Sequence, residues 1–163
     1  MMLALIAALV LPGSPQEPPE ALEPLKFLIG VWTGQGRLDN GVEYTDEQRF
    51  EWVHHRQFIK SEYLLRTGGK IVHTATSILG YDYEKKRVFA FVFSMTGASG
   101  RTELVSAEKD SFVFEGHASG PGVSADDRVT HTKVDEDTFN VTVEQKKDGN
   151  FATVGKYVYR RKK

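Results

Sequence analysis

From residue 31 to the C-terminus, apolar and polar residues alternate in short runs that turn residues interrupt. In residues 138–145, for example, Phe139, Val141 and Val143 are separated by polar residues. A period of two is typical of a β-strand with one buried face. The pattern predicts ten strands, at residues 31–38, 42–53, 57–66, 70–81, 87–94, 101–107, 112–118, 128–134, 138–145 and 151–160.

The connections between these strands are short, and this favours an antiparallel meander. Asn40 and Gly41 supply the two positive-φ residues of a type I′ turn, and Gly68 and Gly69 make the next hairpin. Residues 119–127 form the longest predicted irregular segment. An open meander has two bare edges, which closure into a barrel removes. The sequence therefore predicts an all-β fold, a ten-stranded antiparallel up-and-down barrel that is wide enough to hold one small ligand.

The segment before the first strand follows another pattern. Residues 20–29 predict a short helical turn that lies over one end of the barrel. Its apolar positions are Leu22, Leu25, Phe27, Leu28 and Ile29. Gly30 then leads to Trp32, and Gly34 and Gly36 follow at alternate positions, which suits a strand that bends or is closely approached. We interpret Gly30, Trp32, Gly34 and Gly36 as structural residues.

The first twenty residues are distinct from the rest. Residues 2–11 are apolar without a break, and a Pro-rich polar spacer follows them. Ten residues are too few for a stable membrane span but fit the apolar region of a signal peptide. No basic residue precedes the run and no Ala-x-Ala site follows it, so an uncleaved membrane-proximal anchor is the alternative. We expect an exported protein, periplasmic or extracellular, with its barrel domain at residues 21–163.

Composition excludes several classes of function. The formal net charge of −1 arises from 21 Lys+Arg and 22 Asp+Glu, which gives no basic face for nucleic acid. Cysteine is absent, so no disulfide, thiolate metal site or cysteine nucleophile exists. The spacing of the histidines matches no zinc motif, and we expect no metal site. They are His54, His55, His73, His117 and His131.

The Gly30-x-Trp32 start, the long meander and an arginine at the end of the last strand resemble the calycin superfamily, which includes lipocalins, fatty-acid-binding proteins and nitrobindins. The resemblance implies that Trp32 packs at one end of the barrel against Arg160, with Arg161 as second choice. The longer pattern resembles a bacterial exported family that is a domain of unknown function. Its matching pieces are residues 28–36, Glu51 and Trp52, Phe58, Tyr63, residues 79–82, residues 93–95 and Arg128.

Nitrobindins also share the Gly-x-Trp-x-Gly-x-Gly start, and they bind haem through a histidine late in the barrel. This chain has no histidine after His131. We therefore expect neither haem nor any other cofactor.

Polar residues also stand inside the apolar strands, and those that face inward must be paired or solvated. They are Gln48, Arg49, Ser61, Thr76, Arg128, Thr130, His131, Thr142 and Lys156. A few polar groups in an apolar pocket are typical of small-ligand sites, but a structural hydrogen-bond network fits the same pattern.

The first hypothesis is an exported barrel that binds a small, largely apolar molecule, whose anionic head faces Arg128. Trp32 would form the floor of the pocket, and entry would lie past residues 119–127. The predicted ligand-binding residues of the wall are Ile59, Ser61, Tyr63, Phe89, Phe91 and Phe93, and Leu65 is a further apolar residue of the predicted wall. We place the phenylalanines inside because three exposed ones would form an apolar patch that soluble monomers avoid. If they lie outside, Val88, Ala90 and Val92 line the cavity instead.

Two alternatives remain open at this point. One is an enzyme, an isomerase or hydrolase that uses the same pocket, although no acid–base pair can be recognised and no catalytic residue is predicted. The other is a barrel with a filled core that acts through its surface. The sequence leaves the oligomeric state open.

Overall fold

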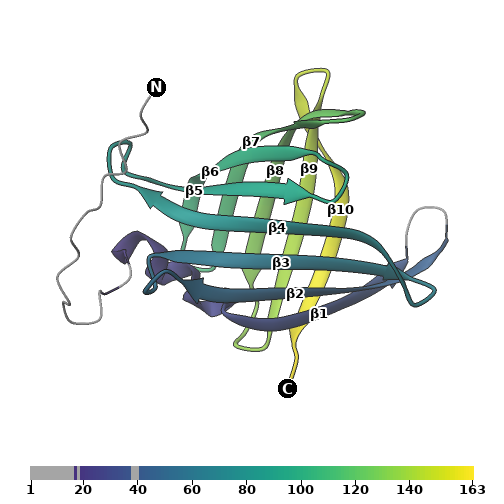
Figure 1. Ribbon diagram of the computed structural model, residues 1–163, viewed down its shortest axis with the longest axis horizontal. Coiled ribbons are helices and arrows are strands. Elements are labelled where there is room, and N and C mark those ends of the chain that lie inside the picture. Colours follow the sequence, from purple (N-terminus) through teal and green to yellow (C-terminus); the bar gives the residue numbers. More distant parts are fainter. Residues whose placement is uncertain (1–16, 18, 38–40) are drawn as a thin grey trace, which may run out of the picture.

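Ten antiparallel strands close into a barrel in the computed structural model, which describes residues 17, 19–37 and 41–163 (Figure 1). Each strand pairs with its neighbours along the chain, and β1 pairs with β10 to close the ring. The strands are β1 Gly30–Arg37, β2 Glu43–Val53, β3 Phe58–Thr67, β4 Lys70–Asp82, β5 Arg87–Ser94, β6 Ser99–Glu108, β7 Ser111–Gly120, β8 Val123–Lys133, β9 Thr138–Lys147 and β10 Asn150–Arg161. The predicted fold class, an all-β barrel of ten antiparallel strands, is confirmed.

The prediction of a long irregular segment at residues 119–127 was wrong. β7 continues to Gly120 and β8 begins at Val123, so only Pro121 and Gly122 lie between them. Gly122 has a φ of +73°, which a tight turn requires and which glycine adopts at no steric cost. The polar residues of β8 that we predicted to form a loop are instead paired with β7. There, His117 Nδ1 lies 2.8 Å from Asp126 Oδ1.

Other sequence predictions fall partly outside the described residues. The apolar run at residues 2–11 lies outside them, and so does Asn40 of the predicted type I′ turn. Its neighbour Gly41 has a φ of +81°, which is compatible with such a turn. Among the described helices, none is long and apolar enough to cross a membrane.

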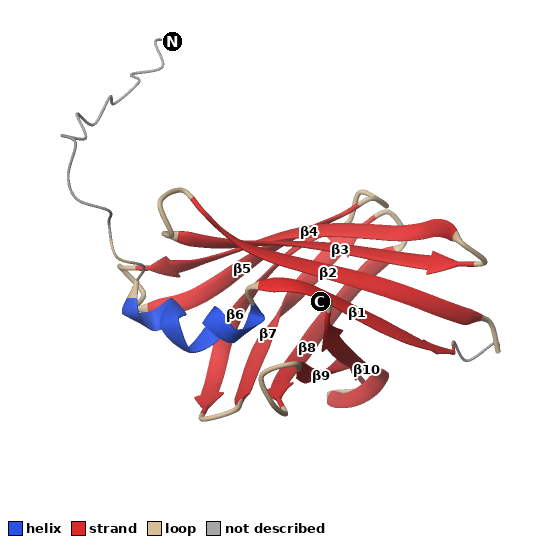
Figure 2. Ribbon diagram, turned by 90° about the horizontal axis from the view of Figure 1, so that it is seen from below, coloured by secondary structure: helices blue, strands red, loops and turns tan. Residues whose placement is uncertain are grey.

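Within the described residues, one helix, η1 (Glu20–Leu28), precedes the barrel and lies across one of its ends (Figure 2). It is a 3-10 helix, with three residues per turn, so Leu22, Leu25 and Leu28 fall on one face and all three are buried. The predicted helical turn over the barrel end is thus confirmed, and the spacing of its leucines explains the helix type.

The core lies under η1. Leu25, Leu28 and Trp32 are at most 1% exposed there, and Phe139 is fully buried beside them. The edge of the Trp32 ring contacts Phe139 at a centroid distance of 4.8 Å, and Phe139 stacks on Tyr159 at 4.9 Å. These rings close one end of the barrel with apolar side chains.

The alternating glycines of β1 make room for large side chains of other strands. A Cβ at Gly36 would lie 2.6 Å from the Tyr44 hydroxyl, and one at Gly30 would lie 2.5 Å from Arg161 Nη1. At Gly34 the same space is occupied by Asp46 and by the ring of Tyr159. The glycines are therefore structural because inward-facing side chains cover them.

Candidate functional site

The interior of the barrel contains a cavity of about 230 Å³, partly open to solvent, next to the core under η1. Most of its lining is apolar, and polar side chains are interspersed. The lining residues are Leu28, Gln48, Phe50, Ser61, Tyr63, Ala75, Thr76, Ser77, Leu79, Ala90, Val92, Thr102, Phe114, Val129 and His131.

The cavity exists because small residues occupy inward positions of β3 to β6. Ser61 of β3 pairs with Ser77 of β4, and Ala90 of β5 pairs with Thr102 of β6. Ala75 adds another small side chain on the wall. Since larger side chains at these positions would meet across the barrel, their small size leaves the space that a ligand needs.

Two polar atoms at this cavity are buried and lack a hydrogen-bond partner among the described residues. They are Oε1 of Gln48 and Nδ1 of His131. Both residues line the cavity, one from β2 and one from β8. Both atoms are themselves buried against protein, so other atoms of these two side chains line the cavity.

The electrostatic character of the cavity is neutral. Its lining includes no Asp, Glu, Lys or Arg, and its titratable side chains are Tyr63 and His131. Burial lowers the pKa of His131 to about 4, and its ring contacts Phe114 and Phe139 at centroid distances of 6.0 Å and 6.1 Å. Burial also raises the pKa of Tyr63, with a smaller contribution from Asp46. Both side chains are therefore uncharged at pH 7.

The structure brings three of the predicted wall residues to the interior. Ser61 and Tyr63 line the cavity. Ile59, on the same face of β3, is fully buried in the adjoining core. Trp32 is likewise fully buried in that core, but it is not among the lining residues, so Leu28 and Phe50 form the floor that we predicted for it.

The prediction that Phe89, Phe91 and Phe93 face inward was wrong. Phe91 is 41% exposed and Phe93 is 53% exposed, whereas Ala90 and Val92 line the cavity. The alternative, in which the phenylalanines lie outside, agrees with the structure for Ala90 and Val92, whereas Val88 is buried in the core and does not line the cavity.

Two contacts explain how an outer face tolerates these rings. The guanidinium of Arg101 lies 5.3 Å from the Phe89 ring centroid and 5.6 Å from that of Phe91. The ring of Phe89 also covers Gly80 on β4, where a Cβ would lie 2.9 Å from it. A charged side chain and a glycine thus reduce the apolar patch that we expected soluble proteins to avoid.

The prediction that Arg128 faces a ligand was also wrong. Val129 and His131 point into the barrel, so Arg128 points out from the same strand. Its Nε donates a hydrogen bond to Glu115 Oε1 at 2.8 Å, and its guanidinium lies 3.9 Å from the centroid of the Phe151 ring. It is a residue of the outer surface, not a partner for a ligand in the cavity.

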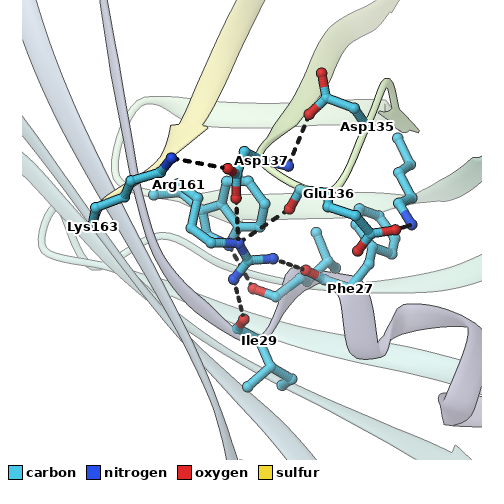
Figure 3. Close-up of polar contacts among 10 residues, drawn as sticks. Phe27, Ile29, Asp135, Glu136, Asp137, Arg161 and Lys163 are labelled. Carbon is cyan, nitrogen blue, oxygen red and sulfur yellow. Dashed lines mark hydrogen bonds and ion pairs between the residues drawn. The ribbon is translucent and has the colours of Figure 1, made fainter.

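The arginine that packs on Trp32 is Arg161, the second choice, and not Arg160. The guanidinium of Arg161 also donates hydrogen bonds to the carbonyl oxygens of Phe27 and Ile29 (Figure 3). Trp32 pairs with Arg161 across the β1–β10 seam, and Thr33 pairs with Arg160. Paired residues share a face of the sheet, so the partner of an inward tryptophan must be Arg161. Arg160 is exposed on the opposite face.

Asp46 and Tyr159 form a hydrogen-bonded pair inside the barrel near β1. Asp46 is 3% exposed, and the hydroxyl of Tyr159 donates a hydrogen bond to its Oδ2 at 2.8 Å. Burial raises the pKa of Asp46, although hydrogen bonds from Tyr159 and the backbone oppose this shift. Asp46 is not among the lining residues of the cavity.

Sequence reasoning noted Gln48 and His131 as polar residues within apolar strands but did not assign them to the site. The signal was present, since both share the phase of inward apolar neighbours, Phe50 and Val129. Arg128 and Thr130 in the same stretch made the phase ambiguous. In the described part of the chain, no group of three or more His, Cys, Asp or Glu side chains is arranged so that it could hold a metal ion.

No family model matches the chain, and no curated protein matches its sequence. Among solved structures, it is similar to the structure of EF1p2_mFAP2b bound to DFHBI. The likeness covers 87% of this chain and 99% of that one, at a TM-score of 0.41 and 10% sequence identity. A likeness this slight transfers no function, so the class of the protein rests on its own geometry: an antiparallel ten-stranded barrel with an interior cavity.

Proposed function

We propose that the barrel binds a small, largely apolar molecule in its interior cavity. The observation that carries this proposal is a mostly apolar, neutral cavity of about 230 Å³ in the barrel interior, whose lining includes the polar side chains of Gln48 and His131. A mostly apolar wall with a few polar groups that fix orientation is the usual composition of a small-molecule site.

The same geometry favours binding over catalysis. A general acid or base works best when its pKa lies near the working pH. Of the two titratable side chains at the cavity, His131 has its pKa lowered to about 4 and Tyr63 has its pKa raised, both away from neutrality. This supports a binding role in preference to the isomerase or hydrolase alternative.

The size of the cavity favours binding over a purely structural barrel. An apolar cavity of about 150 Å³, engineered in another protein, is large enough to bind benzene. The cavity here is larger, at about 230 Å³, and a core filled only for stability would leave few voids of this size.

Native mass spectrometry of the protein purified from its own host tests the proposal, with Val92→Phe as the comparison. Val92 lines the cavity, so the added ring fills part of it with an apolar group and leaves the outer surface unchanged. We expect a one-to-one adduct of low mass in the wild type and none in the variant. A protein that retains no small molecule, and that binds no small aromatic probe in titration calorimetry, would contradict the proposal.

We also propose that the protein is exported, because residues 2–11 have the length and composition of a signal-peptide core. Fractionation of the host cells and N-terminal sequencing of the purified protein test this. An intact N-terminus on a membrane-associated protein would favour the anchor alternative, and an intact N-terminus in the cytosol would contradict export.

A further inference from the structure

We propose that two copies of this chain form a dimer through the outer face of β4 and β5. The centre of the interface is the β5 patch, which we define as Ile78, Phe91, Phe93 and Met95. The proposal goes beyond ligand binding, because the patch lies on the outer side of the wall whose inner side lines the cavity.

The patch is continuous across two neighbouring strands. Phe91 and Phe93 alternate along β5 with Ala90 and Val92, which line the cavity, so both rings point away from the interior. Ile78 of β4 is the cross-strand partner of Phe91 and shares its face of the sheet. The three apolar side chains therefore lie side by side on the outer surface.

Met95 extends the patch beyond the end of β5. Its amide donates a hydrogen bond to the carbonyl oxygen of Thr74 at 3.0 Å, which continues the β4–β5 ladder by one residue and keeps Met95 on the face of Phe93. The exposed fraction rises along the patch, from 41% at Phe91 to 53% at Phe93 and 60% at Met95. The guanidinium of Arg101 packs on Phe91, whereas no cation or ring within the described residues packs on Phe93.

The exposed area is sufficient for the core of an interface. An aromatic side chain has roughly 200 Å² of surface, so Phe91 and Phe93 together expose about 200 Å². Met95 and the partly exposed Ile78 bring the patch to roughly 300 Å², a size at which exposed apolar patches are often functional. A standard interface buries about 800 Å² on each partner, with an apolar core inside a polar rim. The polar neighbours of the patch must therefore form the rim.

Charges of both signs flank the patch. Toward β3 and β2 there are two cations and two anions, and toward β6 there are three cations and two anions. The first group is Arg49, Glu51, Lys60 and Glu62, and the second is Asp82, Lys85, Arg87, Arg101 and Glu103. Each carboxylate forms an ion pair with a cation of its own group. A surface so close to neutral does not repel a second copy, and it lacks the cluster of cations that an anionic membrane attracts.

Two-fold symmetry fits this distribution of charge. A closed dimer uses the same patch on both subunits, so each Phe93 contacts the patch of the other copy. With the two-fold axis along β5, the β3 side of one copy lies opposite the β6 side of the other. The group with one excess cation then faces the balanced group, and the two groups with an excess cation do not meet.

Sedimentation velocity of the purified protein over a range of concentrations tests the proposal. We expect a reversible monomer–dimer equilibrium with a dissociation constant of about 10 μM, because an interface of this area is at the small end of specific interfaces. A protein that remains monomeric at about 100 μM, ten times that value, would contradict the proposal. Open-ended association without a defined dimer would contradict it as well.

Variants locate the interface. Phe93→Glu places a charge at the centre of the patch and should raise the dissociation constant at least tenfold. Val158→Glu, at a residue of β10 that is 50% exposed, is the matched control and should leave the equilibrium unchanged. Met95→Glu provides the comparison if Phe93→Glu does not fold. A dimer that persists in Phe93→Glu and in Met95→Glu would overturn the proposal.

Cross-linking gives a second measurement. The chain has no cysteine, so one substitution introduces a single thiol. Ser99→Cys, at the β6 partner of Phe93, should be joined between chains by a short bismaleimide, and Val158→Cys should not. Cross-linking of Val158→Cys alone would place the contact elsewhere and contradict the proposal.

Flotation with vesicles of phosphatidylcholine and phosphatidylglycerol distinguishes the other occupant of an exposed apolar face. We expect the protein to remain in the aqueous fraction. If it floats with the vesicles as a monomer and Phe93→Glu does not, the β5 patch binds membranes and the dimer proposal is wrong.

Discussion

The guanidinium of Arg161 lies 4.1 Å from the centroid of the Trp32 indole ring. It also joins the last strand to the segment before the first, through Phe27 and Ile29 (Figure 3). Arg161 Nη1 donates a hydrogen bond to the carbonyl oxygen of Ile29 at 2.8 Å, and Nη2 donates one to that of Phe27 at 3.0 Å. The indole nitrogen of Trp32 donates to the carbonyl oxygen of Leu28 at 2.6 Å. The end of η1 is thus held by both residues of one cross-strand pair.

Trp32→Ala should reduce the free energy of unfolding by about 3–5 kcal/mol, the usual effect of removing a buried aromatic side chain. Trp32 is fully buried, and its ring contacts Phe139 as well as Arg161. Denaturant unfolding followed by circular dichroism measures the change. A variant with the melting temperature of the wild type would contradict the structural role of Trp32.

Arg161→Met should destabilise the protein by about 1–3 kcal/mol, since two backbone carbonyl groups lose a charged donor and Trp32 loses its cation–π contact. Arg160→Met, one residue earlier on the exposed face, is the matched control and should have little effect. The same denaturant titration compares them. Equal losses in the two variants would show that the assignment of Arg161 is wrong.

Two adjacent substitutions in β5 test which face of the strand meets the ligand. Phe91→Glu changes the exposed face and should leave ligand binding unchanged, whereas Val92→Phe should abolish it by filling the cavity. Titration with 4-ethylphenol, a small aromatic probe, measures both, and circular dichroism confirms that each variant is folded. Loss of binding in Phe91→Glu with retention in Val92→Phe would reverse the orientation of the strand.

β5 also shows what the sequence alone could and could not establish. The alternation in residues 87–94 located the strand correctly, and the turn residues placed it within a meander. Both faces of this strand are apolar, however, so alternation could not say which one is inside. The deciding contacts, Arg101 over Phe89 and Phe91, come from the neighbouring strand β6.

The sequence could not say which arginine packs on Trp32, for a related reason. Arg160 and Arg161 are adjacent, and a shift of one residue exchanges inward and outward faces. Only the β1–β10 register, which pairs Trp32 with Arg161, resolves the choice. The cavity itself depends on small residues of separate strands, such as Ala75 and Ala90, and no local pattern shows that they lie around one space.

Asp46→Asn should change how stability depends on pH. Burial raises the pKa of Asp46, so the folded state holds its proton at pH values where the unfolded state has released it. The contribution of Asp46 to the free energy of unfolding therefore falls as pH rises. The fall begins near the pKa of Asp46 in the unfolded state, about 4, and ends above the higher pKa of Asp46 in the folded state. The variant, which keeps an acceptor for Tyr159, should gain stability relative to the wild type as pH rises from 3 to 7. A constant difference between the two proteins over that range would contradict this.

Tyr159→Phe provides a second measurement on the same pair. The Tyr159 hydroxyl donates to Asp46 Oδ2 and lowers the pKa of this carboxyl group, so its removal should raise that pKa further. The fall in stability with rising pH should then become larger than in the wild type. A smaller fall would mean that the hydroxyl does not stabilise the ionised form of Asp46.

His131 should give the opposite dependence, in a range of pH that overlaps. Burial lowers its pKa from 6.5 to about 4, so between these values the unfolded state binds a proton that the folded state does not. Stability from this group is fully present above pH 6.5 and is lost as pH falls toward 4, by about 3 kcal/mol in total.

His131→Phe removes the titrating group but keeps an aromatic ring beside Phe114 and Phe139. The variant should therefore lose less stability than the wild type between pH 7 and pH 4.5, in denaturant unfolding at each pH. His55→Asn, a change at an exposed turn residue with a φ of +54°, should retain the wild-type profile. If His131→Phe and the wild type lose stability in parallel on acidification, His131 is not buried as a neutral side chain in the folded protein.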